Sequence, residues 1–212
     1  MNLDSYQIYD ISPEISPQTA VFPGDTPFSA QFLLDMQKGH NLTLSSIQTT
    51  VHIGAHTDAP SHYSVTGQTM EQRDPKIYLG PVQVITVNLP RKTRVSPADL
   101  NGVEIKAPRV LFKTNSFPDP KHWNDDFCAL EPDLIEFLHQ KNVCLVGLDT
   151  PSVDLADDKV LAAHHAIHAC DMAILEGVVL TAVPDGLYQL MALPLKIKGA
   201  DASPVRAILL GL

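Results

Sequence analysis

Apolar residues gather in short runs along the chain, and most of these runs predict β-strands. The runs are rich in Val, Ile, Leu and Thr and are bounded by Pro, Gly, Asn or Asp, as is typical of strands. They are YQIYDI (6–11), LTLSSIQTTV (42–51), VQVITVNL (82–89), VLFKT (110–114), VCLVGLD (143–149), YQLMALPL (188–195) and VRAILLGL (205–212). Several are continuously apolar, so we expect strands that are buried on both faces.

Two segments predict helices. The segment 131–141, EPDLIEFLHQK, has Pro132 placed for a first turn and its apolar residues on one broad face. A second helix is expected over 155–168, with two aspartates near its start, where the helix dipole favours negative charge. Strand outweighs helix, so the pattern predicts one mixed α/β domain over residues 1–212.

Composition and charge narrow the class of protein. A hydrophobic content of 44% indicates a soluble globular chain, and no apolar run approaches the length that spans a bilayer. A formal net charge of −9 argues against a nucleic-acid partner, because phosphate binding needs clustered Lys and Arg. The three cysteines form no CxxC spacing and the first residues do not resemble a signal peptide, so we expect a cytoplasmic protein without a membrane partner.

The strongest chemical signal is HIGAHTDAPSH (52–62). His52, His56 and Asp58 are ligand types that suit Zn²⁺ or another first-row divalent ion. Glycine and the Ala-Pro step oppose a helix here, so we expect a loop or strand end that curls around an ion. The next imidazole, His62, is either a further ligand or a group free for proton transfer.

A second window supplies further candidates. Glu176 interrupts the apolar stretch MAILEGVVL (172–180), and a buried carboxylate is costly unless it is paired or bound to a cation. The alternative is an edge strand that places Glu176 in water. Upstream lie His164, His165 and His168, for which a solvated helix face is the alternative. The residues alone do not choose among these three.

If both windows face one cavity, the side chains suffice for two divalent ions with Asp58 as a bridge. Two-metal sites favour hydrolysis, because the ions acidify a water and polarise a carbonyl. A G-x-S-x-G elbow, a P-loop and a dinucleotide fingerprint are absent from the sequence, which disfavours serine hydrolases and nucleotide-dependent enzymes. Two weaker signals remain: a turn at Phe22, either plain turn chemistry or a pocket wall, and polar residues in LDTPS (148–152) that we expect to cap the next segment.

The window HIGAHTDAPSH resembles the signature H-x-G-[TA]-H-x-D-x-P-x-H of the metal-dependent cyclase-like hydrolases. Along nearly the whole chain, further segments resemble the bacterial kynurenine formamidase (arylformamidase) branch of that family. These segments are DISPEISPQTAVFPGDTPF, YLGPVQVI, VGLDTPSVD, AAHHAIHACDMAILEGVVL and LPLKIKGADASPVRAIL. The resemblance implies a swivelling β/β/α fold, with mixed sheets in a barrel-like core and peripheral helices, assembled as a homodimer.

The resemblance also implies an activity and a site. The activity is hydrolysis of the linear amide N-formyl-L-kynurenine to L-kynurenine and formate in tryptophan degradation, by a metal-activated hydroxide. One ion would be held by His52, His56 and Asp58, and the second by Asp58, His164 and Glu176. His62 would be the acid/base group. Zinc is the family's usual metal, and manganese or another divalent ion occurs among relatives.

One position departs from the family. Relatives carry Trp where this chain has Phe22, in the turn that lines the substrate pocket, so an aromatic face remains while the indole N–H donor is lost. A first alternative is therefore another small-amide hydrolase of the superfamily, similar to isatin hydrolase. A second is a non-catalytic metal- or ligand-binding protein in which His62 is only structural.

Overall fold

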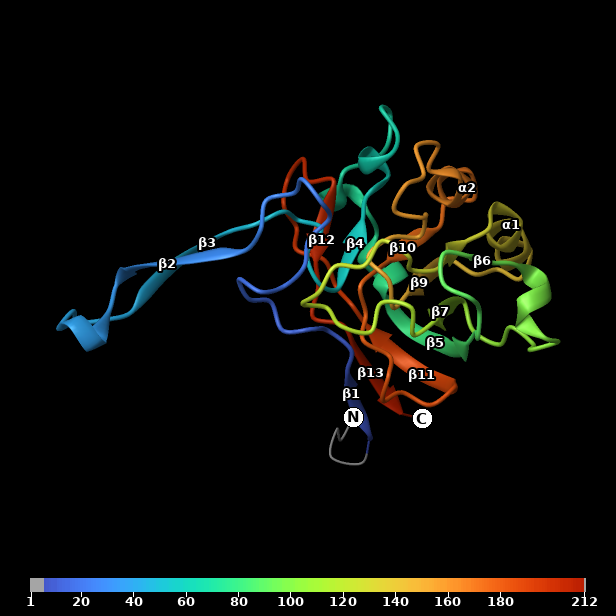
Figure 1. Ribbon diagram of the computed structural model, residues 1–212, viewed down its shortest axis with the longest axis horizontal. Helices are drawn as coiled ribbons and strands as arrows, with labels where there is room; N and C mark the ends of the chain where they lie inside the picture. Colours follow the sequence, from blue (N-terminus) through green and yellow to red (C-terminus); the bar gives the residue numbers. More distant parts are fainter. Residues whose placement is uncertain (1–5, 212) are drawn as a thin grey trace.

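A seven-stranded mixed sheet forms the centre of the protein in a computed structural model that describes residues 6–211 (Figure 1). Positions 1–5 and 212, which the predicted domain includes, lie outside the described residues. The strands are β1 (Ile8–Asp10), β2 (Ser29–Leu34), β3 (Leu44–Gln48), β4 (His56–Asp58), β5 (Leu79–Thr86), β6 (Arg94–Val95), β7 (Arg109–Lys113), β8 (Ala129–Leu130), β9 (Leu145–Leu148), β10 (Ala173–Leu175), β11 (Gly186–Met191), β12 (Ala202–Pro204) and β13 (Ile208–Gly211). The α-helices in this part of the chain are α1 (Pro132–Gln140) and α2 (Ala162–Ala169).

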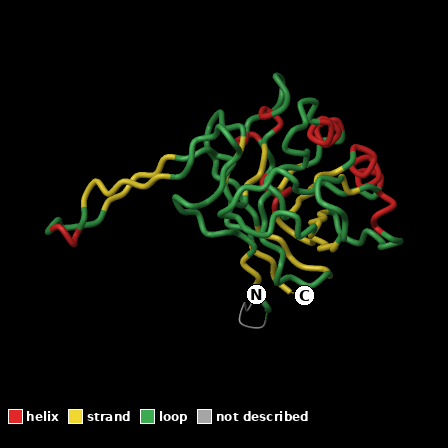
Figure 2. The backbone as a smooth tube through the Cα atoms, in the orientation of Figure 1, coloured by secondary structure: helices red, strands yellow, loops and turns green. Residues whose placement is uncertain are grey.

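The strand order divides the central sheet into an antiparallel and a parallel half. The order is β1-β13-β11-β5-β7-β9-β10. Neighbours from β1 to β5 run antiparallel, and neighbours from β5 to β10 run parallel. The sheet curls into a half-barrel with the two helices at its periphery (Figure 2). This is the α/β fold with a barrel-like core that the resemblance implies.

Each of the seven apolar runs predicted to form strands carries one. The parallel half is buried on both faces, and all four residues of β9 are buried. On β7, Val110 and Phe112 point into the core beneath α1 and α2, whereas Leu111 points into the core inside the curled sheet. Because burying one such side chain contributes about 1.5–3 kcal/mol, this alternation holds the strand between two apolar layers.

The predicted helix over 131–141 is confirmed, but the prediction of a helix over 155–168 is wrong for its first half. α2 begins at Ala162, because Leu161 has a left-handed backbone with φ 55°. Upstream, the Asp158 carboxylate accepts hydrogen bonds from backbone N–H groups at 2.7 and 3.2 Å, and such local bonds compete with helix formation. Within residues 6–211, no helix is long and apolar enough to cross a membrane.

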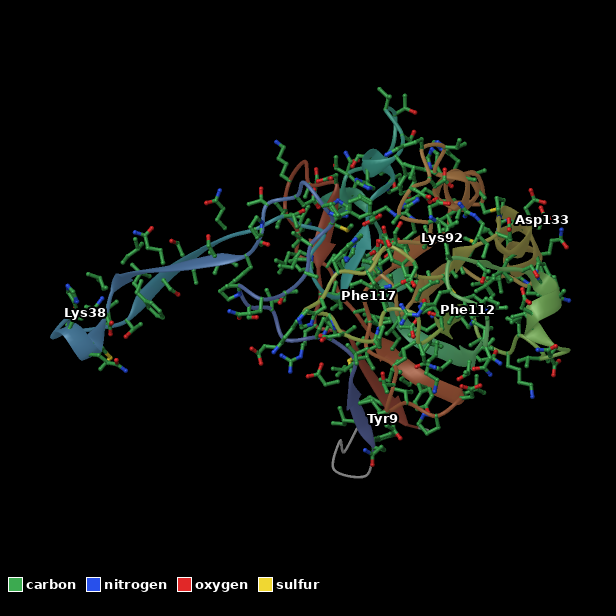
Figure 3. The ribbon with its side chains drawn as sticks, viewed as in Figure 1. Tyr9, Lys38, Lys92, Phe112, Phe117 and Asp133 are labelled. Carbon is green, nitrogen blue, oxygen red and sulfur yellow. The ribbon has the colours of Figure 1, made fainter. Side chains whose placement is uncertain are left out.

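A two-stranded arm, residues 29–48, projects from the body of the protein (Figure 1). β2 pairs with β3, and Lys38 lies near the tip, far from Phe112 in the core (Figure 3). The arm is exposed along its length, although it carries large apolar side chains. These are Phe32, Leu33, Met36, Leu42, Leu44 and Ile47. The sequence predicts β3 but not its partner β2.

Candidate metal centre

The first histidine window lies on β4 and its flanking turns. β4 pairs antiparallel with β12, which places Asp58 opposite Ala202. Because side chains alternate along a strand, His56 and Asp58 face one side and Thr57 faces the other. Thr57 anchors the strand there, since its hydroxyl donates to the carbonyl of Ile174 at 2.5 Å. The prediction of a strand end in place of a helix is confirmed.

A two-way backbone bridge joins this window to Glu176. The N–H of His56 donates to the carbonyl of Glu176 at 3.0 Å, and the N–H of Glu176 donates to the carbonyl of His56 at 2.9 Å. The close approach requires glycine at Gly177, which has φ +65°, because a Cβ there would lie 2.2 Å from the carbonyl oxygen of Gly54. Glu176 is 2% exposed, which excludes the alternative of an edge strand that places it in water.

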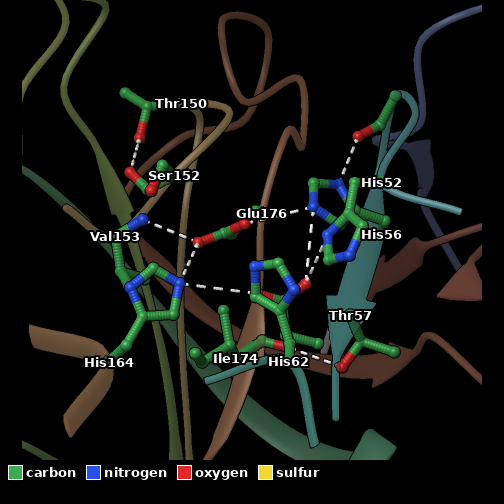
Figure 4. A network of polar contacts seen from close by, with 12 residues as sticks. His52, His56, Thr57, His62, Thr150, Ser152, Val153, His164, Ile174 and Glu176 are labelled. Carbon is green, nitrogen blue, oxygen red and sulfur yellow. Dashed lines mark hydrogen bonds and ion pairs between the residues drawn. The ribbon is translucent and has the colours of Figure 1, made fainter. Parts of the chain in front are cut away.

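Three imidazoles lie around Asp58, and Glu176 lies beside two of them. Figure 4 labels these four side chains, which are His52, His56, His164 and Glu176. Asp58 Oδ1 lies 3.0 Å from Nδ1 of His52 and 3.6 Å from Nε2 of His56. Asp58 Oδ2 lies 3.5 Å from Nε2 of His164. Glu176 closes the cluster, with Oε2 at 3.1 Å from Nε2 of His56 and Oε1 at 4.0 Å from Nε2 of His164. The five residues that the resemblance assigns to two ions therefore meet in space.

The structure chooses among the three histidines of α2. His164 is buried and points its Nε2 toward Asp58, while its Nδ1 lies 2.7 Å from the Asp154 carboxylate. His165 is exposed, and the ring of His168 packs near Tyr63 at 5.9 Å between centroids. A solvated helix face thus describes His165, and His164 alone of the three enters the cluster around Asp58.

Asp58 provides the clearest indication that a cation belongs in this cluster. Both carboxylate oxygens are buried, and within residues 6–211 neither takes part in a well-formed hydrogen bond. Imidazole nitrogens lie at ion-pair distance from it, but none makes a hydrogen bond of ordinary geometry, so both oxygens keep lone pairs that a cation could take. Imidazole and carboxylate donors suit a first-row divalent ion, and such an ion would satisfy Asp58. The residues present therefore fit a metal.

The carboxylates and imidazoles of the cluster shift one another's pKa values toward the charged forms. Burial opposes ionisation of Asp58, but His164 and His52 outweigh it and hold the pKa of this carboxyl well below its usual range. Burial likewise disfavours protonated His164, yet Asp154 and Asp58 raise its pKa to about 10. For His52, Asp58 and Asp201 overcome burial and raise the pKa to about 9. The metal-free cluster therefore holds protons that an ion would displace.

His62 lies beside the buried cluster, at the end of a 3₁₀ helix that begins at Pro60. Its side chain is 35% exposed, and its ring centroid lies 4.2 Å from that of His52. Ligand-type atoms of Asp58, His62 and His164 also lie within 4.8 Å of one another, so His62 has the reach of a ligand as well as that of a proton carrier. The geometry is therefore compatible with both roles predicted for His62, as a further metal ligand or as a group that transfers protons.

A cavity of about 620 Å³ opens above the cluster. Phe22 and Phe117 form part of its wall, and the edge of the Phe22 ring packs against Trp123 at 5.0 Å between centroids. The backbone N–H of Asp25 donates to the carbonyl of Phe22, so this segment is also the predicted turn. Phe22 is therefore both a turn residue and part of the pocket wall.

Asp149 corrects one prediction. The polar residues of LDTPS (148–152) are predicted to cap the next segment, and Ser152 does so, because its hydroxyl accepts from the N–H of Asp154 at 3.1 Å. The Asp149 carboxylate instead accepts from the backbone N–H groups of Thr114 at 2.9 Å and Asn115 at 2.7 Å. Both residues follow β7, the strand beside β9. Asp149 thus fastens two neighbouring strand ends at the cavity, because it meets the amide groups that leave the sheet there.

Two carboxylates that contact the histidines are missing from the sequence prediction. Asp154 holds His164, and Asp201 Oδ2 lies 3.0 Å from Nε2 of His52. No spacing or composition distinguishes either aspartate from others in the chain, so only the folded contacts reveal them.

The sequence model of one protein family, Cyclase, matches residues 9–155. The chain belongs to the Cyclase family. The match includes the whole HIGAHTDAPSH window and ends before α2. The family resemblance of the motif is thereby confirmed for the part of the chain that contributes His52, His56, Asp58 and His62.

Solved structures of similar fold carry related descriptions. One, described as a potential metal-dependent hydrolase with cyclase activity, is 25% identical to this Cyclase-family chain, with a TM-score of 0.84 over 98% of this chain and 99% of the other. A predicted metal-dependent hydrolase from Bacillus stearothermophilus is 24% identical, with a TM-score of 0.82 over 98% and 100% of the two chains. Isatin hydrolase A from Labrenzia aggregata is 22% identical, with a TM-score of 0.83 over 98% and 94%. The last two likenesses establish the fold.

Proposed function

We propose that this chain is a metal-dependent amidohydrolase that converts N-formyl-L-kynurenine to L-kynurenine and formate in tryptophan degradation. The observation that carries the proposal is Asp58, a buried carboxylate without a hydrogen bond among the described residues, placed between imidazoles beneath a cavity. The similar solved structures described as metal-dependent hydrolases support the hydrolase class. The segments that resemble kynurenine formamidases support the substrate.

Two divalent ions, most simply zinc, would occupy the cluster. His52 and His56 would hold one ion, His164 and Glu176 the other, and Asp58 both, because its two oxygens face the two sets of nitrogens. When bound, such ions lower the pKa of a water and polarise a carbonyl oxygen. Manganese would be accepted by the same donors.

His62 would carry the proton in this reaction. It takes a proton from the attacking water as the hydroxyl joins the formyl carbon, and it returns the proton to the arylamine nitrogen as the C–N bond breaks. Its position beside His52, at the less buried side of the cluster, supports this role, because the group would have to reach both the water and the leaving nitrogen. An arylamine is a weak base, so its departure needs less help from a proton than an alkylamine would.

Isatin is a second candidate substrate, because two similar solved structures are isatin hydrolases, from Labrenzia aggregata and Ralstonia solanacearum. Isatin is also an aryl amide, although a cyclic one, and the wall formed by Phe22 and Phe117 would accept either ring. The two candidates share the metal chemistry and differ in how the amide fits the pocket.

The decisive experiment follows hydrolysis of N-formylkynurenine and of isatin by protein purified without chelators. We expect more than one ion per chain, faster turnover of N-formylkynurenine, loss of activity on chelation and recovery with zinc. His164→Ala should lose metal and activity, whereas His165→Ala, the exposed neighbour on the same helix, should keep both. Faster hydrolysis of isatin than of N-formylkynurenine would make isatin hydrolysis the favoured function. A protein that binds metal but hydrolyses neither amide would instead be the non-catalytic alternative.

We further propose that the chain works as a homodimer through the arm of residues 29–48. An isolated two-stranded hairpin is marginally stable in water, and this one exposes Phe32 at 61% and Ile47 at 67%. The body carries a groove of about 650 Å³ lined mainly by apolar residues, among them Leu193 and Leu195. In a homodimer, the arm of one copy would pack into the groove of the other.

A further inference from the structure

Asp201 is held rigidly beside the ligand strand. It directly precedes β12, and its carbonyl accepts a hydrogen bond from the N–H of Ala59 at 2.8 Å, which continues the pairing of β12 with β4. The preceding residue is fixed as well, because the N–H of Met70 donates to the carbonyl of Ala200 at 2.9 Å. The backbone therefore presents the Asp201 side chain at a defined place next to Asp58.

One oxygen of Asp201 meets two imidazoles. Its Oδ2 lies 3.0 Å from Nε2 of His52 and 3.4 Å from Nδ1 of His62. A carboxylate only accepts hydrogen bonds, so both nitrogens donate to it. The opposite nitrogen of His52, Nδ1, faces Asp58 at 3.0 Å and is the nitrogen from which an ion would displace a proton. For His62, Nε2 is left as the nitrogen that exchanges protons.

The other histidines of the cluster are held in the same manner, each by one acceptor. His56 Nδ1 lies 3.0 Å from the carbonyl oxygen of Gly54, and His164 Nδ1 lies 2.7 Å from the Asp154 carboxylate. Each contact leaves the remaining nitrogen directed toward Asp58 or Glu176. Such acceptors fix the tautomer and orientation of metal-binding histidines. Asp201 differs because it reaches a second imidazole outside the buried cluster.

We infer that Asp201 is a positioning residue that holds the metal ligand His52 and the proton carrier His62 in register through a single carboxylate oxygen. The inference rests on the proposed function and deepens it, because it couples the metal site to the proton path. A surface ion pair would contribute little, but the His52 partner is only 15% exposed, so this contact is sheltered from water.

The test compares Asp201→Ala with Asp185→Ala. Asp185 is a matched control, since its carboxylate is 53% exposed against 48% for Asp201 and it binds Thr86 and Lys113 away from the cavity. Zinc affinity is measured by competition with a chelator, and kcat is measured at saturating zinc. Two-bond ¹H–¹⁵N spectra of the zinc-loaded protein report the tautomer of His62 without any substrate, with His62→Ala identifying its signals.

We expect Asp201→Ala to weaken zinc binding about 10- to 100-fold and, at saturating zinc, to lower kcat about 10- to 100-fold. Asp201→Glu should restore part of both losses, and Asp185→Ala should change neither. In a His62→Ala background, Asp201→Ala should still weaken zinc binding but should lower kcat no further. The spectra should show the proton on Nδ1 of His62 in the parent protein and not in Asp201→Ala.

Four results would overturn the inference. They are unchanged zinc affinity, full recovery of kcat by zinc alone, an unchanged His62 tautomer, and a lower ion count in Asp201→Ala, which would make Asp201 a ligand. If the parent protein hydrolyses neither N-formylkynurenine nor isatin, the proposed function fails separately. Zinc affinity and the His62 tautomer then decide the role of Asp201.

Discussion

His56 and Glu176 face each other twice, through the backbone and through their side chains. Two backbone hydrogen bonds join them, and Nε2 of His56 lies 3.1 Å from Oε2 of Glu176. The bridge links β4 to the end of β10, so two distant stretches of sequence contribute to one cluster. The separation of the two side chains is thus set by the sheet.

The first prediction concerns the shared carboxylate. Asp58→Asn should lose both ions, because one side chain is expected to serve both, whereas Glu176→Gln should lose one and keep the other. The Gln oxygen can still accept the hydrogen bond that Glu176 receives from Val153, at 2.6 Å, so the fold should survive. Metal analysis of the purified variants measures the difference. Loss of the same single ion from both variants would contradict the bridging role.

The second prediction separates proton transfer from coordination. His62→Ala should keep both ions and lose about 10²–10⁴-fold in kcat, the usual contribution of an acid/base group. His52→Ala, whose ring lies beside that of His62, should lose metal and activity together. Metal content and kcat are measured on both variants. If His62→Ala loses an ion in proportion to its activity, His62 is a ligand.

The third prediction concerns pH and the metal-free protein. The folded-state pKa values of His52, about 9, and His164, about 10, lie above the usual value of 6.5. Raised values mean that these groups stabilise the fold fully below pH 6.5 and lose that contribution as the pH rises through 9 to 10. Thermal unfolding of chelated protein should therefore show Tm falling over this window, relative to His164→Ala.

The zinc-loaded protein should respond in the opposite direction, because protons compete with the ions for the same nitrogens. Zinc affinity should rise with pH from 6 to 8. A chelated protein whose Tm is flat between pH 6.5 and 10 would show that the imidazoles are neutral without metal, contrary to the expected charge state.

The fourth prediction concerns Phe22. Phe22→Trp introduces the indole N–H donor that the resemblance to kynurenine formamidases implies at this position. One hydrogen bond contributes about 0.5–1.5 kcal/mol, so KM for N-formylkynurenine should fall about two- to tenfold with kcat little changed. Phe22→Leu removes the aromatic face and its contact with Trp123, so it should raise KM. If both variants leave KM unchanged, this wall of the cavity does not contact the substrate.

The fifth prediction concerns the arm. Phe32→Asp combined with Ile47→Asp should convert a dimer into monomers, because two charges would have to be buried at the interface. Lys38→Ala, near the tip of the arm, is the control and should leave the dimer intact. Size-exclusion chromatography with light scattering measures the mass. A parent protein that is monomeric at micromolar concentration would remove the arm as an interface.

The sequence predicts the parts of the molecule whose signals are local. Continuous apolar runs identify the central strands because those strands are buried on both faces, and Pro132 with an apolar face identifies α1. The same reasoning fails at residues 155–161, where aspartate side chains bind nearby backbone groups and prevent the helix. It also misses β2, although it predicts the partner strand β3. Neither strand of the arm packs on a core, so burial imposes no apolar pattern there, and β3 is found only by the alternation in its own LTLSSIQTTV run.

The site shows the same division. The sequence identifies the first window because metal-ligand residue types recur there at short spacing. It identifies Glu176 because a carboxylate interrupts an apolar run. Both are local features. Strand order, the choice of His164 on α2, and the roles of Asp154 and Asp201 depend on contacts between distant segments. No pattern within a window contains that information, so only the fold supplies it.

The close approach of Gly177 to Gly54 also affects how tolerance to mutation would be interpreted around this site. Any side chain at Gly177 would collide with backbone at 2.2 Å, so a screen for activity should reject substitutions there as completely as at His56. The two positions fail for different reasons, one by steric exclusion and one by loss of a metal-binding nitrogen. Extra zinc in the growth medium would rescue weakened ligands but not Gly177. Positions that tolerate no substitution therefore include those where two backbone segments lie too close for a side chain, and not only those that bind metal.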